Sequence, residues 1–335
     1  MPLKQFAQKK ITDRWIRVVR DVAPEKEGAL LVCRKRFFAG ECKESHGYLR
    51  ASLCRLRDVC PIDANAYTYN QSEDALEILG ILNRGVGGGK KLRLWAGEFT
   101  LPRSAWNRVG DNDAKKVKGL ASNVINRLFS DEGRYFLGFE VSFHYWHSSE
   151  PFRGWYPHVH VNISDVAWER DKQEWERLNL YQNDLGKSGE CQLSQVWREA
   201  FESEYGSVKA RDFVVHWAYR NGLTSVRHRL SYAMRNPVVD CYKAISKFDY
   251  RPEQDREWAS RMLLRPKTEK RTQWYGFLSD NQKSKYLKKL GYVLEAKAVR
   301  RKKRSKRVCF EDGTDISWNC VAEDLDFALE HHGER

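Results

Sequence analysis

The sequence predicts an α+β fold in which a mostly antiparallel sheet is covered by helices on one face. Residues 134–163 carry the first observation, because apolar and polar residues alternate there in two strands joined by a polar loop. The second observation is the order of the elements: strand, helix, strand, strand, helix, strand, helix. Strands from distant parts of the chain must then meet in one layer with the helices packed against it.

The strand pair in 134–163 has one apolar and one polar face. The apolar residues that alternate with polar ones are Leu137, Phe139, Val141 and Phe143 in the first strand and Val159, Val161 and Ile163 in the second. Strand side chains switch faces at every residue, so pairing would place Glu140 on the face of His158 and His160. Two imidazoles and a carboxylate on a rigid sheet form a candidate site for a divalent metal.

Two other interpretations of this histidine pair stay open. The histidines could be ordinary surface residues on a half-exposed sheet. They could also belong to a His-x-His zinc or iron enzyme built on a β-barrel, which requires a further distant histidine and leaves the basic charge of the chain unexplained.

The remaining elements are predicted by periodicity and by breakers. Ser72 and two acids precede an apolar run, which predicts a capped helix over 72–82. Three consecutive glycines make 83–91 a loop, and the phosphate-loop pattern is absent from it. We then expect a strand (92–102), a helix (113–129), a charged surface insertion (165–189), a helix (193–205), a strand (211–219) and a helix (227–237) stopped by Pro237.

Composition indicates an anionic partner. Lys and Arg outnumber Asp and Glu by 59 to 45, for a net charge of +14, which favours nucleic acid first and an anionic membrane surface second. No run of about 18 apolar residues occurs, so we expect no bilayer span. The first residues lack the apolar core of a signal peptide, so we expect a cytoplasmic protein.

Eight cysteines in a chain of this length are too few for a disulfide scaffold. Five metal-ligand candidates lie close together in the N-terminal segment: Cys33, Cys42, His46, Cys54 and Cys60. A structural zinc site could draw on four of them, and the set we predict is Cys42, His46, Cys54 and Cys60. The alternative is that these are buried thiols, because no Cys-x-x-Cys spacing occurs.

A tyrosine in the helix predicted over 227–237 has basic neighbours. His228, Tyr232 and Arg235 are spaced at i, i+4 and i+7, which places them on one helix face. A phenol with a pKa of about 10 is a weak nucleophile unless a metal polarises the electrophile and cations favour the phenolate. The alternative is that Tyr232 only packs against the sheet.

Together these segments resemble the HUH endonucleases, specifically the replication initiators (Rep proteins) of rolling-circle plasmids and related archaeal plasmids or viruses. GEFTLP (97–102) is similar to the first motif of that family, GWYPHVHVNI (154–163) to its His-hydrophobic-His motif, and YAMR (232–235) to its Tyr-x-x-Lys motif with Arg in place of Lys. Glu140 matches an acidic position on the preceding strand, and 193–201 matches a helix between the second and third motifs.

The resemblance implies a ferredoxin-like or RRM-like sheet and a nuclease that nicks and rejoins single-stranded origin DNA. It implies Mg²⁺ or Mn²⁺ held by His158, His160 and Glu140, and a 5′-phosphotyrosyl intermediate on Tyr232. Arg235 and His228 would assist the tyrosine. Tyr242 is a second tyrosine nearby and stays an alternative nucleophile. Single-stranded and duplex origin DNA would be the partners. A host helicase would unwind the DNA, and a host polymerase would extend the nicked strand.

We predict three segments: an N-terminal cysteine-containing segment (1–85), the nuclease domain (86–250) and a C-terminal accessory region (251–335) that lies outside the resemblance. The last contains a basic arm, 297–307, with eight bases and no acid, followed by an acidic tail. Such an arm typically binds DNA phosphates. The residues that we expect to contact phosphate are Arg300, Arg301, Lys302, Lys303, Arg304, Lys306 and Arg307. Alternative functions are an HUH transposase or relaxase, or a non-catalytic nucleic-acid-binding protein with a structural metal site.

Overall fold

The structure is a computed structural model. It describes residues 11–31, 33, 37–41, 47–51, 54–87, 92–110, 113–147, 154–180, 192–208, 213–247, 251–264, 272–291 and 317–322. For 37–41, 47–51, 147, 154, 247 and 317–322 it describes the backbone alone. The basic arm (297–307) and two of the predicted zinc ligands, Cys42 and His46, lie outside the described residues.

The chain divides into two compact units that interleave in sequence. One contains Met1–Asn70, Ile245–Leu263 and Glu295–Arg335, and the other contains Gln71–Ala244 and Leu264–Leu294. This division differs from the three consecutive segments that we predicted. Residues 264–294 return to the second unit, where they add a strand to its central sheet.

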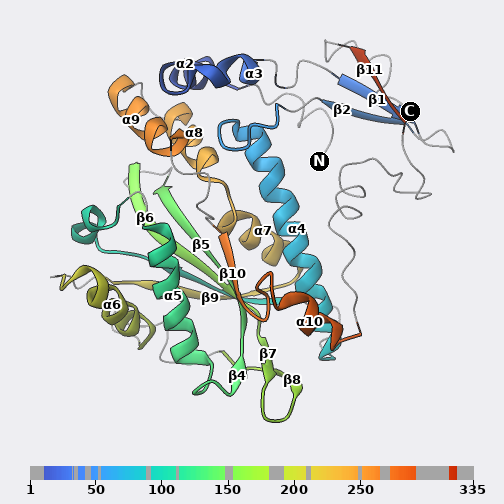
Figure 1. The fold of residues 1–335 in the computed structure, drawn as a ribbon, viewed down its shortest axis with the longest axis vertical. Coiled ribbons are helices and arrows are strands. Elements are labelled where there is room, and N and C mark those ends of the chain that lie inside the picture. Colours follow the sequence, from blue (N-terminus) through green and yellow to red (C-terminus); the bar gives the residue numbers. More distant parts are fainter. Residues whose placement is uncertain are drawn as a thin grey trace. The chain divides into compact units, whose positions relative to one another are not determined.

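The first unit combines short helices with a small sheet (Figure 1). Its elements are α2 (Asp13–Val22), η1 (Pro24–Lys26), α3 (Glu27–Leu31), α9 (Pro252–Leu263), β1 (Phe37–Glu41), β2 (Gly47–Ala51) and β11 (Ser317–Ala322). The sheet has the order β11-β1-β2. The Arg14 guanidinium on α2 pairs with the buried Asp255 carboxylate on α9 at 2.5 Å, which fixes these two helices together.

Helix α9 begins at a proline, and so do two further α-helices. Helix α4 (Pro61–Gly85) includes the predicted helix 72–82 but starts eleven residues before Ser72, because Pro61 suits the first helical position, where its missing N–H is no loss. Helix α8 (Pro237–Lys247) likewise starts at Pro237. The predicted helix 227–237 is therefore wrong at its end: α7 (Leu223–Ala233) ends before Pro237, which begins the next helix.

A five-stranded antiparallel sheet forms the centre of the second unit (Figure 1). Its order is β10 (Thr272–Gly276), β5 (Gly138–His147), β6 (Gly154–Ile163), β3 (Arg93–Phe99) and β9 (Val215–Asn221). The predicted α+β class and the pairing of the strands in 134–163 are confirmed. Strand β10 was not predicted.

The apolar face of this sheet packs against α5 (Ala114–Phe129) and α6 (Gln192–Tyr205). Trp197 of α6 meets Phe99 edge to face, with ring centroids 5.3 Å apart. Phe129 of α5 stacks on Trp217 of β9 at 5.5 Å. Aromatic pairs of this kind add to the stabilisation from apolar burial.

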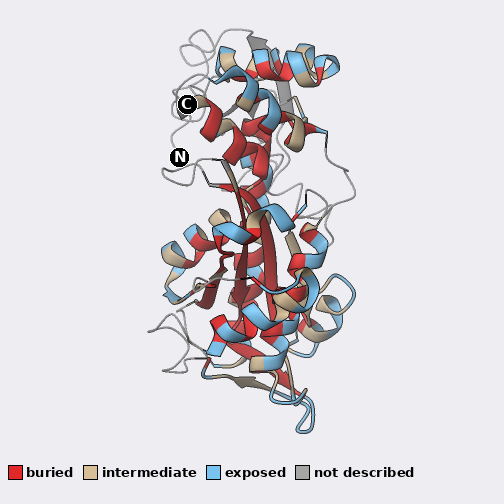
Figure 2. Ribbon diagram, turned by 90° about the vertical axis from the view of Figure 1, so that its left-hand side faces the viewer, coloured by how far each residue is buried: buried red, intermediate tan, exposed pale blue. Residues whose placement is uncertain are grey.

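The polar face is covered as well, so the expectation of helices on one face is wrong. Helix α7 packs over it, and Arg229 of α7 donates a hydrogen bond of 2.7 Å to the Gly97 carbonyl oxygen of β3. An apolar core that includes Leu79 of α4, Leu94 of β3 and Leu230 of α7 continues on this side. Figure 2 shows the central strands as buried. Arg229 supplies hydrogen bonds to polar groups that α7 buries, and buried polar groups need such partners.

A smaller sheet and a few short elements complete the second unit. The sheet has the order β4-β7-β8. The bounds are β4 (Tyr135–Phe136), β7 (Val166–Glu169), β8 (Glu174–Arg177), η2 (Arg103–Arg108) and α10 (Lys283–Lys288). Residues 165–189 were expected to be a surface insertion, but every residue of β7 is buried.

Candidate metal centre and tyrosine

Three imidazoles meet on the polar face of the central sheet. His158 and His160 lie two residues apart on β6, and His144 lies on β5 directly opposite His158. One ring nitrogen from each lies within 4.8 Å of the others, and the three residues are 2%, 1% and 0% exposed for His144, His158 and His160. His144 was not among the predicted ligands, although it continues the polar row of Glu140 and Ser142 in this strand.

Backbone carbonyl groups orient two of these rings. His144 Nε2 donates a hydrogen bond of 2.6 Å to the Ala233 oxygen, and His158 Nδ1 donates one of 2.7 Å to the Tyr156 oxygen. Metal-binding histidines commonly donate their other ring N–H to a carbonyl or carboxylate in this way, which fixes the tautomer and the ring orientation.

His160 has no such partner. Both of its ring nitrogens are buried without a hydrogen bond to any described residue. Burial holds the pKa of His160 well below its usual range, and the charges of His144 and Arg229 lower it further. A buried neutral imidazole without a hydrogen bond to the described residues is an exception to the rule that buried polar groups are satisfied, and a bound cation would remove the exception.

Glu140, the predicted third metal ligand, lies on the same face but outside the histidine group. Its register partner is Asn162, whose Nδ2 donates a hydrogen bond of 2.6 Å to Glu140 Oε2. The Ser142 hydroxyl donates to the other carboxylate oxygen. Arg229 Nε in turn donates to Asn162 Oδ1 at 3.3 Å. Glu140 is therefore held in a hydrogen-bonded set beside the histidines.

A different carboxylate lies next to the histidines. Glu98 of β3 is opposite His160 in the sheet, and its Oε2 lies 3.9 Å from His160 Nδ1. Its side chain is 24% exposed, so the carboxylate reaches solvent. Glu98 could supply an oxygen ligand from the open side of the group.

The donor set decides which cations fit. Imidazole nitrogen suits first-row transition ions, whereas Mg²⁺ prefers oxygen ligands. Of the two ions that the resemblance implies, Mn²⁺ therefore fits these residues better than Mg²⁺. The third histidine also meets the requirement of a His-x-His zinc or iron enzyme, although the sheet here is an open one of five strands and not a barrel.

Tyr232, on α7, lies against the histidine group of β5 and β6. Its ring centroid is 5.2 Å from that of His160 and 5.9 Å from that of His144. The Arg235 guanidinium lies 4.6 Å from the same ring, in cation–π geometry. Burial raises the pKa of Tyr232 above its usual value, while the Arg235 charge lowers it and the Glu98 charge raises it. The group is thus a neutral phenol at physiological pH.

The other predicted site residues, Arg235, His228 and Tyr242, have different surroundings. Arg235 lies beyond the end of α7 and forms an ion pair with the buried Asp240, whose Oδ2 is 3.9 Å from His144 Nδ1. His228 lies on α7 but is exposed. Tyr242, the alternative nucleophile, lies on α8 and is half-buried.

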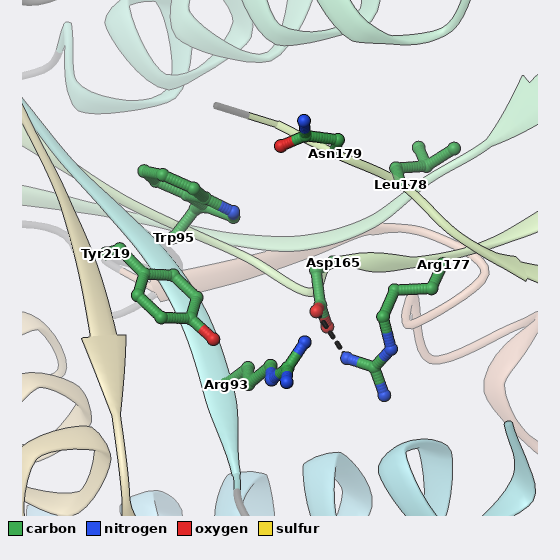
Figure 3. A pocket seen from close by; sticks show the side chains of 7 residues that line it. All are labelled: Arg93, Trp95, Asp165, Arg177, Leu178, Asn179 and Tyr219. Atoms are coloured by element: carbon green, nitrogen blue, oxygen red, sulfur yellow. Dashed lines mark hydrogen bonds and ion pairs between the residues drawn. The ribbon is translucent and has the colours of Figure 1, made fainter. Parts of the chain in front are cut away.

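An open cleft lies near the start of β3 and the end of β9 (Figure 3). It has a volume of about 520 Å³, and its lining residues are Arg93, Trp95, Asp165, Arg177, Leu178, Asn179 and Tyr219. Arg93 Nε is buried without a hydrogen bond to any described residue, and Tyr219 is 40% exposed. Strand alternation places Trp95 and Tyr219 on the face opposite His160.

The described cysteines of the N-terminal segment come together with one acid. Cys54 and Cys60, two of the four predicted zinc ligands, lie beside Cys33 and Asp63. Cys33 was among the candidates in the sequence, whereas Asp63 was not.

Comparisons of the chain with protein-family models, with curated proteins and with solved structures found no match. None of the helices in the described part of the chain has the length and apolar character that crossing a membrane requires.

Proposed function

We propose that the protein is a metal-dependent DNA endonuclease of the replication-initiator type, which nicks and rejoins single-stranded origin DNA through a 5′-phosphotyrosyl link on Tyr232. The observation that carries this proposal is the contact between the Tyr232 ring and the group formed by His144, His158 and His160. The candidate nucleophile is thus in ring contact with two residues of the candidate metal site.

The chemistry assigns a task to each residue. The Tyr232 oxygen attacks the scissile phosphorus and loses its proton; the P–O3′ bond breaks, and the 3′ oxygen takes up a proton and leaves as a 3′-hydroxyl. The three imidazoles, with Glu98 beside them, would hold a divalent ion, which when bound polarises the phosphate. Arg235, over the ring, favours the phenolate form of Tyr232. Rejoining is the reverse reaction.

The charge and the cleft support nucleic acid as the partner. The net charge is +14, and the cleft combines an arginine with an exposed tyrosine. Single-stranded nucleic acid is bound by such combinations, in which cations follow the backbone and aromatic rings stack on bases. The basic arm (297–307) adds a set of candidate phosphate contacts.

A covalent capture experiment tests the proposal without knowledge of the origin. The full-length protein is incubated with a pool of random single-stranded oligonucleotides and Mn²⁺, denatured in detergent, and the DNA that stays attached is sequenced. We expect attached DNA with a shared cleavage sequence, and none when EDTA replaces Mn²⁺ or with the double variant His158→Ala, His160→Ala. Tight binding of the pool without any covalent product in Mn²⁺ would contradict the proposal.

The second candidate is a nucleic-acid-binding protein whose metal is structural. The near-complete burial of the three histidines favours it, because structural sites are closed whereas catalytic sites keep an open position. The same experiment separates the two, since this protein would retain DNA only before denaturation. An HUH transposase or relaxase would share the nicking chemistry and would be recognised by the DNA sequences that it joins.

A further inference from the structure

The second group of metal-ligand side chains lies in the first unit of the chain, at the start of α4. Cys33, Cys54, Cys60 and Asp63 each offer one atom, and these atoms lie within 4.8 Å of one another. Cys60 and Asp63 are buried, and the two other cysteines are partly buried. Local spacing could not show this group, because Cys33 is brought in from a turn that follows α3.

The separations match a tetrahedral ion. Zinc binds thiolate at about 2.3 Å and carboxylate oxygen at about 2.0 Å, so two thiolates on one zinc are about 3.8 Å apart and a thiolate and an oxygen about 3.5 Å. The Cys33 and Cys60 sulfur atoms are 3.7 Å apart, and the Cys54 sulfur is 3.3 Å from Asp63 Oδ2. A disulfide would need about 2.05 Å between sulfur atoms, so Cys33 and Cys60 are not bonded.

Local structure holds these four positions in place. Arg55, after Cys54, has a φ of 62° and turns the chain sharply. The Cys60 amide donates a 2.6 Å hydrogen bond to the Leu56 oxygen, and the Cys60 oxygen accepts the first hydrogen bond of α4 from Ala64. The fully buried Trp15 anchors the turn by donating from Nε1 to the Val59 oxygen at 3.1 Å.

Asp63 is a buried acid within the group, and no described residue forms an ion pair with it. It is 5% exposed, and its Oδ1 is buried without a hydrogen bond to any described residue. Burying a carboxylate beside thiols is costly unless a cation pairs with it. Three sulfur atoms favour a soft or borderline ion and exclude Mg²⁺ and Ca²⁺.

We infer that Cys33, Cys54, Cys60 and Asp63 bind one structural Zn²⁺ ion. The site is closed by four protein ligands, as structural zinc sites are, and it is separate from the histidine group. The ion links the turn after α3, the 54–60 turn and the first turn of α4, so its binding free energy contributes to the folding of this segment. The inference does not depend on nuclease activity.

Cobalt substitution distinguishes this site from the histidine group, because only thiolate ligands give an intense sulfur-to-cobalt charge-transfer band in the near ultraviolet. The full-length protein is stripped of metal, refilled with Co²⁺ and titrated with Zn²⁺. We expect the charge-transfer band and tetrahedral visible bands, both lost when one equivalent of Zn²⁺ displaces the cobalt. Cys54→Ser and Cys60→Ser should lose the band, while Asp63→Ala should keep the band and bind the metal at least about tenfold more weakly.

Cys241→Ser is the matched control, since Cys241 is a buried cysteine of α8 outside the group, and it should keep the full band. If a cysteine variant fails to fold, wild-type protein provides a second measurement: a mercurial reagent that caps thiols should release one zinc per chain. Wild-type protein without the charge-transfer band, or a disulfide mapped by mass spectrometry between two of Cys33, Cys54 and Cys60, would overturn the inference.

Discussion

His144 Nε2 donates a hydrogen bond of 2.6 Å to the carbonyl oxygen of Ala233, the residue that follows Tyr232. A neutral imidazole that donates from Nε2 has its lone pair on Nδ1. One hydrogen bond thus orients a candidate metal ligand on β5 and ties it to the helix that carries the candidate nucleophile.

Replacing any of the three histidines should weaken metal binding. We expect His144→Ala, His158→Ala and His160→Ala each to raise the dissociation constant for Mn²⁺ by more than about tenfold, because each removes a nitrogen ligand. Titration calorimetry, or electron paramagnetic resonance of free Mn²⁺, measures the change. These variants are made in a Cys60→Ser background, which lacks the proposed sulfur site, so that the measured affinity is that of the histidine group alone.

Two variants serve as controls for that result. His216 lies in the same row of the sheet, opposite Glu98, but is exposed, and His216→Ala should leave the affinity unchanged. Glu140→Gln should lower the free energy of unfolding by about 1–3 kcal/mol through its buried hydrogen bonds, with a smaller loss of metal affinity than His144→Ala. Equal losses for Glu140→Gln and His144→Ala would make Glu140 a ligand, as the sequence suggested.

Much of this site was predictable from strand alternation, because His158, His160 and Glu140 do share a face. The register was not, since it depends on the loop between the strands and not on alternation. The register pairs His144 with His158 and Glu140 with Asn162. A register shifted by two residues would instead have placed Glu140 opposite His160, within the candidate metal site.

Long periodic helices were predicted well, and short or non-local elements were not. The α5 and α6 helices have apolar positions at helical spacing and lie where expected. Strand β10 has five residues and is defined by pairing with β5, which is distant in sequence. The start of α4 at Pro61 was missed because the residues before Ser72 show little helical periodicity. The first-unit metal group depends on Cys33 and Asp63, which only tertiary folding brings together.

The stability of the metal-free protein should depend on pH through His160. Its pKa is well below the usual value in the folded state, whereas in the unfolded chain it is about 6.5. The contribution of His160 to the free energy of unfolding is therefore fully present above about pH 6.5. It declines as the pH falls, by at most about 1.4 kcal/mol per pH unit. Urea unfolding in EDTA at about pH 7.5 and about pH 5.5 should show a smaller decline for His160→Asn. The same decline in both proteins would contradict this prediction.

The open cleft should contribute to binding of single-stranded DNA. Tyr219→Ala should weaken binding by about 1–3 kcal/mol if a base stacks on this ring, and Arg93→Ala should weaken it with a reduced salt dependence. Fluorescence anisotropy of a labelled oligonucleotide measures both. Tyr69→Ala removes another exposed tyrosine and should have no effect. Losses no larger than that of Tyr69→Ala would show that DNA does not occupy the cleft.

The basic arm should contribute affinity without sequence preference. Replacement of Arg300, Arg301, Lys302, Lys303 and Arg304 by Gln should weaken binding equally for all DNA sequences, because phosphate contacts carry little base information. Each lost contact should lower the slope of log affinity against log salt by about 0.7 to 0.9. An unchanged slope would mean that the arm does not contact phosphate.

The most direct test is the identity of the residue that becomes attached to DNA. Protein captured on single-stranded DNA in Mn²⁺ is digested with protease and nuclease, and the nucleotide-bearing peptide is sequenced by mass spectrometry. We expect the adduct on Tyr232, with Tyr232→Phe binding the same DNA but forming no adduct, and with Tyr219→Phe and Tyr242→Phe forming it normally. An adduct on Tyr242 or Tyr219, or an undiminished adduct in Tyr232→Phe, would contradict the assignment of Tyr232 and the role of the histidine group beside it.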